Sequence, residues 1–186
     1  EVDLDGRIVA GHGDLNPAGV VIHGAIHAHA PHAEAVVHLH SRDGVAVSCQ
    51  EHGLLPLTQM ALMVLGDIAY HDFQGVVLDE TERESLLTDI GDKTLLILRN
   101  HGTLAVGRTM PEAFARIWRL ERACRFQLAA QSAGAPLRAL PPEVIARTLE
   151  QGRQLYGAQA SFMPSGKREW SALLRRLDRE LPGYRN

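Results

Sequence analysis

Short apolar runs alternate with helical patterns along the chain, and this alternation predicts an α/β domain. Residues 35–41 and 94–98 are aliphatic or β-branched runs of strand length, and both are typical of buried strands. Residues 103–106 continue as a third strand after a short turn. Residues 67–78 are also strand-like and are interrupted by Gly75. His101 therefore falls at the bend of a strand–turn–strand unit.

Helical periodicity and capping signals occupy the segments between these strands. Asn16 is suited to cap a helix and Pro17 to its first turn, while Thr109 and Glu112 have the spacing of a capping box. A further apolar stretch covers residues 60–65. The predicted helices cover residues 17–30, 44–51, 81–90, 111–131, 141–155 and 170–181.

Length, charge and cysteine usage fit one cytoplasmic domain over residues 1–186. The 19 basic and 22 acidic residues form no long block of one sign, so we expect no nucleic-acid partner and no anionic membrane surface. Cys49 and Cys124 have no CxxC spacing, which predicts two buried, inert thiols in a reducing compartment. The sequence has no signal peptide and no apolar run long enough to span a membrane.

Histidines are concentrated in the first part of the chain, where nine of the ten precede residue 72. His38 and His40 lie two apart on a predicted strand, so their side chains point to the same face. His101 can supply a third imidazole, which leaves an open coordination position as in catalytic metal sites. The spacing of His38 and His40 alone is equally consistent with two strand histidines that bind no metal. A second such pair, His27 and His29, diverges by about 200° on a helix and is the poorer pair of ligands.

Several motifs together resemble the class II aldolase and adducin family. The resemblance covers roughly residues 2–134, with residues 135–186 as a helical C-terminal extension and an N-terminal part of the usual fold missing. The motifs are Asn16-Pro-Ala-Gly-Val-Val-Ile-His-Gly-Ala-Ile-His, Ala35-Val-Val-His-Leu-His-Ser, Gly53-Leu-Leu-Pro-Leu, Gly66-Asp-Ile-Ala-Tyr-His-Asp-Phe, Leu98-Arg-Asn-His-Gly and Glu112-Ala-Phe.

The resemblance implies a fold, an assembly and a metal centre. The fold would be a three-layer αβα arrangement with a central, mostly antiparallel sheet flanked by helices. The assembly would be a homotetramer with active sites between subunits. His38, His40 and His101 would be the metal ligands. The metal would be zinc, with manganese or iron(II) as alternatives, acting as a Lewis acid that stabilises an enolate of a small-molecule substrate.

The chain departs from the family pattern at the catalytic acid. The position of the usual carboxylate falls on Gly19, and no Asp or Glu occurs between Asn16 and His32. His23 and His27 follow one and two helical turns later, which makes them candidates for acid–base or carboxylate-binding work; hydrogen-bonded helix histidines are the alternative. Gln59 is a further pocket candidate.

Residues outside these motifs receive weaker assignments. Tyr70, His71 and Asp72 are possible pocket residues, and Glu121 and Arg122 are interpreted as a solvated or packing pair on the long helix.

Two classes of function follow from this pattern. The first is a metal-dependent lyase, an aldolase or a decarboxylase, that acts on a small hydroxylated carbonyl or carboxylate compound. The missing carboxylate favours decarboxylation, because loss of carbon dioxide itself generates the carbanion. The second is a non-catalytic scaffold module like the adducin head. A third alternative retains the three histidines and uses iron(II) for oxygen chemistry.

Overall fold

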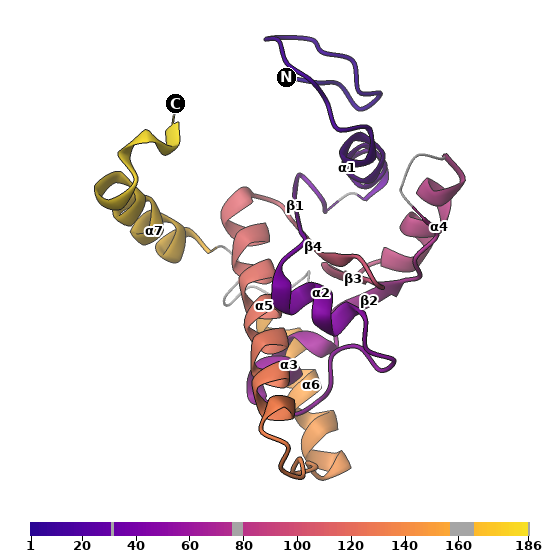
Figure 1. The fold of residues 1–186 in the computed structure, drawn as a ribbon, viewed down its shortest axis with the longest axis vertical. Helices are drawn as coiled ribbons and strands as arrows, with labels where there is room; N and C mark the ends of the chain where they lie inside the picture. The colour runs from indigo at the N-terminus through magenta and orange to yellow at the C-terminus, as the bar shows by residue number, and fades with distance from the viewer. Residues whose placement is uncertain (31, 76–79, 157–165, 186) are drawn as a thin grey trace.

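A four-stranded sheet lies between two groups of helices (Figure 1). The computed structural model describes residues 1–30, 32–75, 80–156 and 166–185. The strands are β1 (Ala35–Leu39), β2 (Ile68–His71), β3 (Leu95–Leu98) and β4 (Gly102–Gly107). The helices are α1 (Pro17–His29), α2 (Arg42–Ser48), α3 (Gln59–Leu65), α4 (Glu80–Ile90), α5 (Met110–Ser132), α6 (Pro142–Tyr156) and α7 (Lys167–Glu180), followed by the 3-10 turn η1 (Pro182–Arg185).

The strand order is β1-β4-β3-β2. β4 pairs antiparallel with both β1 and β3, whereas β2 pairs parallel with β3. The expected mostly antiparallel sheet flanked by helices is therefore confirmed. The register places His38 opposite Leu104, so the C-terminal end of β1 lies beside the beginning of β4.

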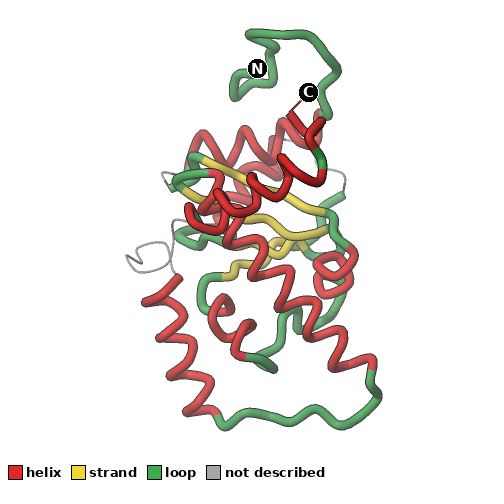
Figure 2. The backbone as a smooth tube through the Cα atoms, turned by 90° about the vertical axis from the view of Figure 1, so that its left-hand side faces the viewer, coloured by secondary structure: helices red, strands yellow, loops and turns green. Residues whose placement is uncertain are grey.

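The two faces of the sheet form two separate cores, because successive strand residues point to opposite sides. Leu96, Leu98, Leu104 and Val106 pack with residues of α1 and α4 on one face. Leu95, Ile97 and Ala105 pack with residues of α2, α3 and α5 on the other. Burial on both faces explains why the runs of β3 and β4 are continuously apolar rather than alternating. Figure 2 shows the strands enclosed by helices in this way.

The predicted caps and the predicted turn are present. The side chain of Asn16 accepts a hydrogen bond from the backbone N–H of Ala18, and that of Thr109 accepts one from Glu112. Between β3 and β4, Asn100 adopts a positive φ of 56°, a conformation that Asn tolerates well. This turn reverses the chain within three residues, 99–101, and sets His101 directly before β4.

Three sequence-based assignments were wrong. The strand predicted over residues 67–78 ends at His71, because its partner β3 has four residues and Asp72 turns away to pair with Arg99; residues 76–79 lie outside the described part. The helix predicted from Gly44 begins at Arg42, since Ser41 is its cap. Cys49 is exposed rather than buried.

Cys124 is the inert thiol that the sequence predicts. It is buried in the core between α5 and the sheet. Burial and, to a smaller extent, the negative charges of Glu121 and Asp43 raise the pKa of the Cys124 thiol to about 12. The thiol therefore stays protonated at neutral pH and is a poor nucleophile.

The C-terminal helices α6 and α7 extend the domain on the side of α5. α6 packs closely against α3, where Gly152 leaves room for the backbone of Met63. α7 stands away from the sheet in Figure 1 and contacts α5 through Trp170, whose ring lies 5.4 Å from that of Phe114. Within the described ranges, no helix is long and apolar enough to cross a membrane.

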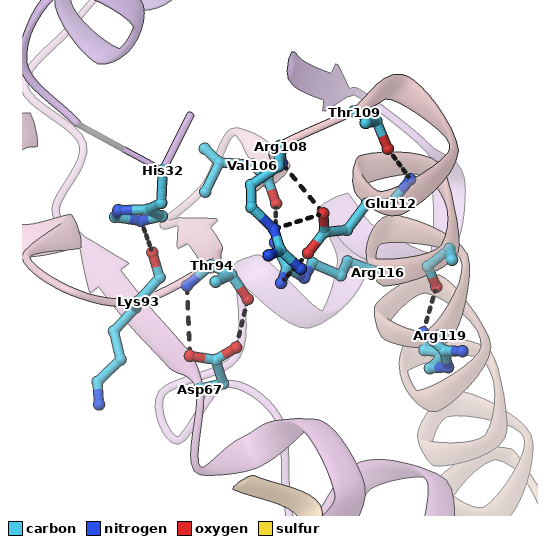
Figure 3. A network of polar contacts seen from close by, with 11 residues as sticks. His32, Asp67, Lys93, Thr94, Val106, Arg108, Thr109, Glu112, Arg116 and Arg119 are labelled. Carbon is cyan, nitrogen blue, oxygen red and sulfur yellow. Dashed lines mark hydrogen bonds and ion pairs between the residues drawn. The ribbon is translucent and has the colours of Figure 1, made fainter. Parts of the chain in front are cut away.

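A buried polar network fixes the beginning of α5 against the sheet (Figure 3). Glu112 forms an ion pair of 2.6 Å with Arg116, and Arg116 donates to the backbone carbonyl of Val106 in β4 at 2.6 Å. Both side chains are almost fully buried. Because both charges are shielded from water, each is stabilised mainly by the other. Removing one of them should lower the free energy of unfolding.

Candidate metal centre

Three histidines converge at the edge where β1 ends and β4 begins. His38 is the fourth residue of β1, His40 follows the strand, and His101 immediately precedes β4. Antiparallel pairing of β1 with β4 brings these positions together, although residues 40 and 101 are far apart in sequence. The fold therefore assembles the three side chains that the sequence singled out.

The three imidazole rings surround one point. The Nε2 atom of His40 lies 2.9 Å from Nε2 of His38 and 2.9 Å from Nε2 of His101. The ring centroids are 4.6 to 4.9 Å apart and the ring planes are nearly perpendicular, at 76° to 84°. In the described part of the chain these histidines form a group whose ligand atoms all lie within 4.8 Å of one another.

The backbone sets the tautomer of His38. Its Nδ1 atom lies 3.0 Å from the carbonyl oxygen of Thr103. A carbonyl only accepts hydrogen bonds, so Nδ1 carries the proton and donates it. In the neutral ring the lone pair is then on Nε2, which is the atom that faces the other two histidines. This is the arrangement of a metal-ligating histidine that a backbone carbonyl orients.

The environment of His38 and His101 keeps these two rings neutral. Burial lowers the pKa of His38 to about 4, with His101, His40 and His23 adding to the effect and the hydrogen bond to Thr103 opposing it. Burial, followed by repulsion from His40 and His71, also lowers the pKa of His101. Protons therefore compete weakly for these nitrogens at neutral pH.

The donor set fits a divalent transition metal. Three imidazole nitrogens that converge on one point match the ligands that zinc, iron and copper prefer. His40 is exposed, so the site is open on that side and has room for a further ligand from solvent or substrate. A closed structural zinc site would instead have four protein ligands.

Of the two helical candidates, His23 is the one whose charge affects the cluster. His23 is close enough to His38 for its charge to lower the pKa of His38. Burial and then repulsion from His27 lower the pKa of His23 itself. His27 lies behind it, with the ring centroids 6.0 Å apart, and its Nδ1 donates to the carbonyl of Ala33 at 2.8 Å. His27 thus fixes the segment before β1.

Gln59 lies elsewhere. It lines an apolar cavity between α3, α5, α6 and α7, together with residues such as Met63 and Trp118. None of the three clustered histidines lines this cavity. The structure therefore does not bring Gln59 together with the triad.

The end of β2 and the residues that follow it contribute to the surroundings of the site. The hydroxyl of Tyr70 accepts a hydrogen bond from the N–H of Leu54 at 3.1 Å, which is a structural contact. His71 is buried, with its Nδ1 2.7 Å from Asp89, and it is near enough to lower the pKa of His101. The ring of Phe73 lies 6.4 Å from that of His101 and is exposed, so it forms one wall of the site.

Two features of the site were not found from the sequence. Phe73 was noted only as part of a motif. Glu121 was interpreted as a solvated or packing residue, yet it accepts hydrogen bonds from Ser41 and Thr103, which adjoin the histidines. The signals in the sequence were Ser41, directly after His40, and Thr103, two residues after His101. The strand patterns do not predict which helix residue contacts these two hydroxyls.

The lowered histidine pKa values predict how the stability of the metal-free protein depends on pH. The unfolded chain takes up protons near pH 6.5, while folded His38 stays neutral to about pH 4. The free energy of unfolding should therefore fall as the pH decreases from 6.5 to 4. Urea titrations of the metal-free protein at pH 7.5 and 5.0 measure this fall. In His38→Ala the fall should be smaller, and an equal fall in both proteins would contradict the assignment.

The protein is an α/β domain with a mostly antiparallel sheet. An open cluster of three histidines at the edge of the sheet is its candidate divalent-metal centre. Residues 1–128 match the model of the family described as class II aldolase and adducin N-terminal domain. The chain belongs to this family.

The relatives include both aldolases and adducins. A solved aldolase II superfamily protein from Pseudomonas syringae is 46% identical with a TM-score of 0.87, covering 100% of this chain and 73% of that one. A solved L-fuculose 1-phosphate aldolase from Glaciozyma antarctica is 28% identical with a TM-score of 0.75, covering 95% and 67%. Mouse alpha-adducin is 39% identical over 100% of this chain, which spans 26% of its length.

Proposed function

We propose that this chain is the catalytic domain of a metal-dependent carbon–carbon lyase, an aldolase or a decarboxylase. Its substrate would be a small hydroxylated carbonyl or carboxylate compound. The observation that carries the proposal is the convergence of three imidazoles on one open point. A binding module has no need of such a site, whereas a Lewis-acid catalyst does.

The ligands in this proposal are the Nε2 atoms of His38, His40 and His101. Zinc is the metal we expect, with manganese and iron(II) as alternatives. When bound, the cation supplies a Lewis acid that polarises a substrate oxygen and stabilises the negative charge that develops as a carbon–carbon bond breaks. The protein's part is to hold the three rings in fixed orientation.

His23 is the group that we assign to proton transfer. It lies on α1, near enough to His38 for its charge to affect the pKa of that ring. Burial lowers the pKa of His23 itself, so that it is neutral at pH 7 and can accept a proton. By the resemblance to class II aldolases, the position of the usual carboxylate falls on Gly19. Loss of carbon dioxide leaves the electron pair on carbon without abstraction of a proton by a base. His23 then only needs to pass a proton from water to that carbon. This difference favours decarboxylation over aldol cleavage.

We further propose that the chain functions as a homotetramer. α7 has a polar and an apolar side, yet none of its residues is buried within one chain. An amphipathic helix of this kind is stabilised by burial of its apolar side, and a second subunit can provide that burial.

Turnover by the metal-loaded protein tests the proposed activity. One set of candidate substrates is sugar phosphates, including L-fuculose 1-phosphate, with release of a carbonyl product as the readout. The other set is hydroxy- and ketocarboxylates, with release of carbon dioxide. We expect metal-dependent turnover in one set and its loss in His38→Ala. Binding of metal without turnover in either set would argue against the lyase.

The adducin relatives support the alternative of a non-catalytic scaffold module. The identity of 39% to mouse alpha-adducin extends over the whole chain, so the sequence is compatible with either role. The retained histidine cluster favours the enzyme. A protein that binds no metal and shows no turnover would fit the scaffold.

A further inference from the structure

Glu121 lies behind the histidine cluster, on the face of the sheet covered by α5. One of its carboxylate oxygens accepts a hydrogen bond from the hydroxyl of Ser41, and the other accepts one from the hydroxyl of Thr103 at 2.5 Å. Ser41 directly follows His40, and Thr103 is the second residue after His101. A single carboxylate therefore links the two chain segments that carry the cluster.

The third histidine is linked to the same carboxylate through Thr103. The backbone carbonyl of Thr103 accepts the hydrogen bond that fixes the His38 ring, at 3.0 Å. Thr103 is fully buried, so water does not replace these contacts. Moving Thr103 would change the orientation of His38 as well as the position of His101.

Close packing around Glu121 leaves little freedom for this arrangement. Gly44 lies against it, and a Cβ atom at that position would be 2.6 Å from Oε1 of Glu121, 2.7 Å from Oγ of Ser41 and 2.9 Å from Cγ2 of Thr103. The three segments thus meet at van der Waals distance. The carboxylate therefore cannot shift without displacing Gly44, Ser41 or Thr103.

We propose that Glu121 is a positioning residue of the metal centre, which holds both ligand-bearing segments in place and contributes a negative charge that favours a bound cation. This inference rests on the metal centre of the proposed function and adds a residue from α5 to it. Residues that orient metal ligands typically contribute about 10- to 100-fold to metal affinity. A purely structural role would instead affect folding and leave metal affinity unchanged.

Cobalt(II) titration of Glu121→Gln distinguishes these roles. The substitution retains the size of the side chain and removes its charge. We expect cobalt affinity to fall about tenfold or more, with a shift of the visible absorption bands because the ligand geometry changes. Urea unfolding of the metal-free protein reports any loss of stability separately.

Glu112→Gln is the matched control, because it makes the same substitution on the same helix. Glu112 pairs with buried Arg116 at the beginning of α5 (Figure 3), and it does not belong to the histidine cluster. We expect it to lower stability at least as much as Glu121→Gln while leaving cobalt affinity and spectrum at wild-type values. Thr103→Val removes one hydroxyl and nearly retains the shape, and a loss of affinity of about threefold or more is expected there.

The outcomes separate this inference from the proposed function. Cobalt affinity within twofold of wild type in both Glu121→Gln and Thr103→Val would overturn the role of Glu121 while leaving the metal centre intact. An equal loss of affinity in Glu112→Gln would also overturn it, since general loosening would then be the cause. No cobalt binding by the wild-type protein would overturn both proposals. If Glu121→Gln does not fold, the cobalt affinity of Thr103→Val decides between a positioning role and a purely structural role for Glu121.

Discussion

Replacement of His38 by alanine is expected to remove the metal from this protein. His38 is the most firmly oriented of the three proposed ligands, because its Nδ1 donates to Thr103 and its Nε2 faces the cluster. Alanine leaves two imidazoles, of which His40 is exposed. Residues that only orient a ligand contribute about 10- to 100-fold to affinity, so loss of a ligand should cost more than about 100-fold. Isothermal titration with zinc measures the difference.

His52→Ala is the control for this experiment. His52 is exposed in the turn after α2, outside the cluster, so its variant removes one histidine without touching the centre. Zinc affinity should stay at the wild-type value. His101→Ala should behave like His38→Ala. Wild-type zinc affinity in either cluster variant would show that the three histidines are not the ligands.

Replacement of Gly102 by alanine is the second change with a large expected effect. A Cβ atom at residue 102 would overlap the backbone carbonyl oxygen of Leu39 and lie 3.4 Å from Cδ2 of His40. The obstacle is backbone, so β1 and β4 must move apart to accommodate the methyl group. Overpacking of this kind costs about 1 to 3 kcal/mol. Because His38 lies on β1 and His40 and His101 directly adjoin the ends of the two strands, zinc affinity should also fall by about tenfold or more.

Urea unfolding and zinc titration of the same Gly102→Ala protein measure both effects. Gly183→Ala is a suitable control, since no atom lies within 4 Å of the added Cβ and neither property should change. If Gly102→Ala lost stability but bound zinc with unchanged affinity, the close approach of β1 to β4 would not be what positions the ligands.

The sequence predicts the centre of the fold well because local and long-range signals agree there. The apolar runs of β3 and β4 flank a turn at Arg99 and Asn100, and a two-residue period aligns His38 with His40. These patterns depend only on neighbours in the chain. Few other strands are available as partners for β1 and β4, so their pairing can be anticipated. This is why the three histidines could be grouped before the structure was known.

Contacts between distant elements could not be predicted in the same way. The role of Glu121 depends on the rotation of α5 about its axis, which the packing of Ile117 and Leu120 against the sheet determines. The position of Gln59 depends on where α6 and α7 pack, and neither helix resembles a family motif. The residue at which β2 ends depends on the length of its partner β3, and that length cannot be predicted from the sequence of β2 alone.

Elemental analysis of the protein purified without added metal tests the central claim most directly. The account predicts close to one equivalent of zinc, manganese or iron per chain, bound by His38, His40 and His101. The absence of bound metal, even after incubation with each of these ions and removal of the excess, would contradict it.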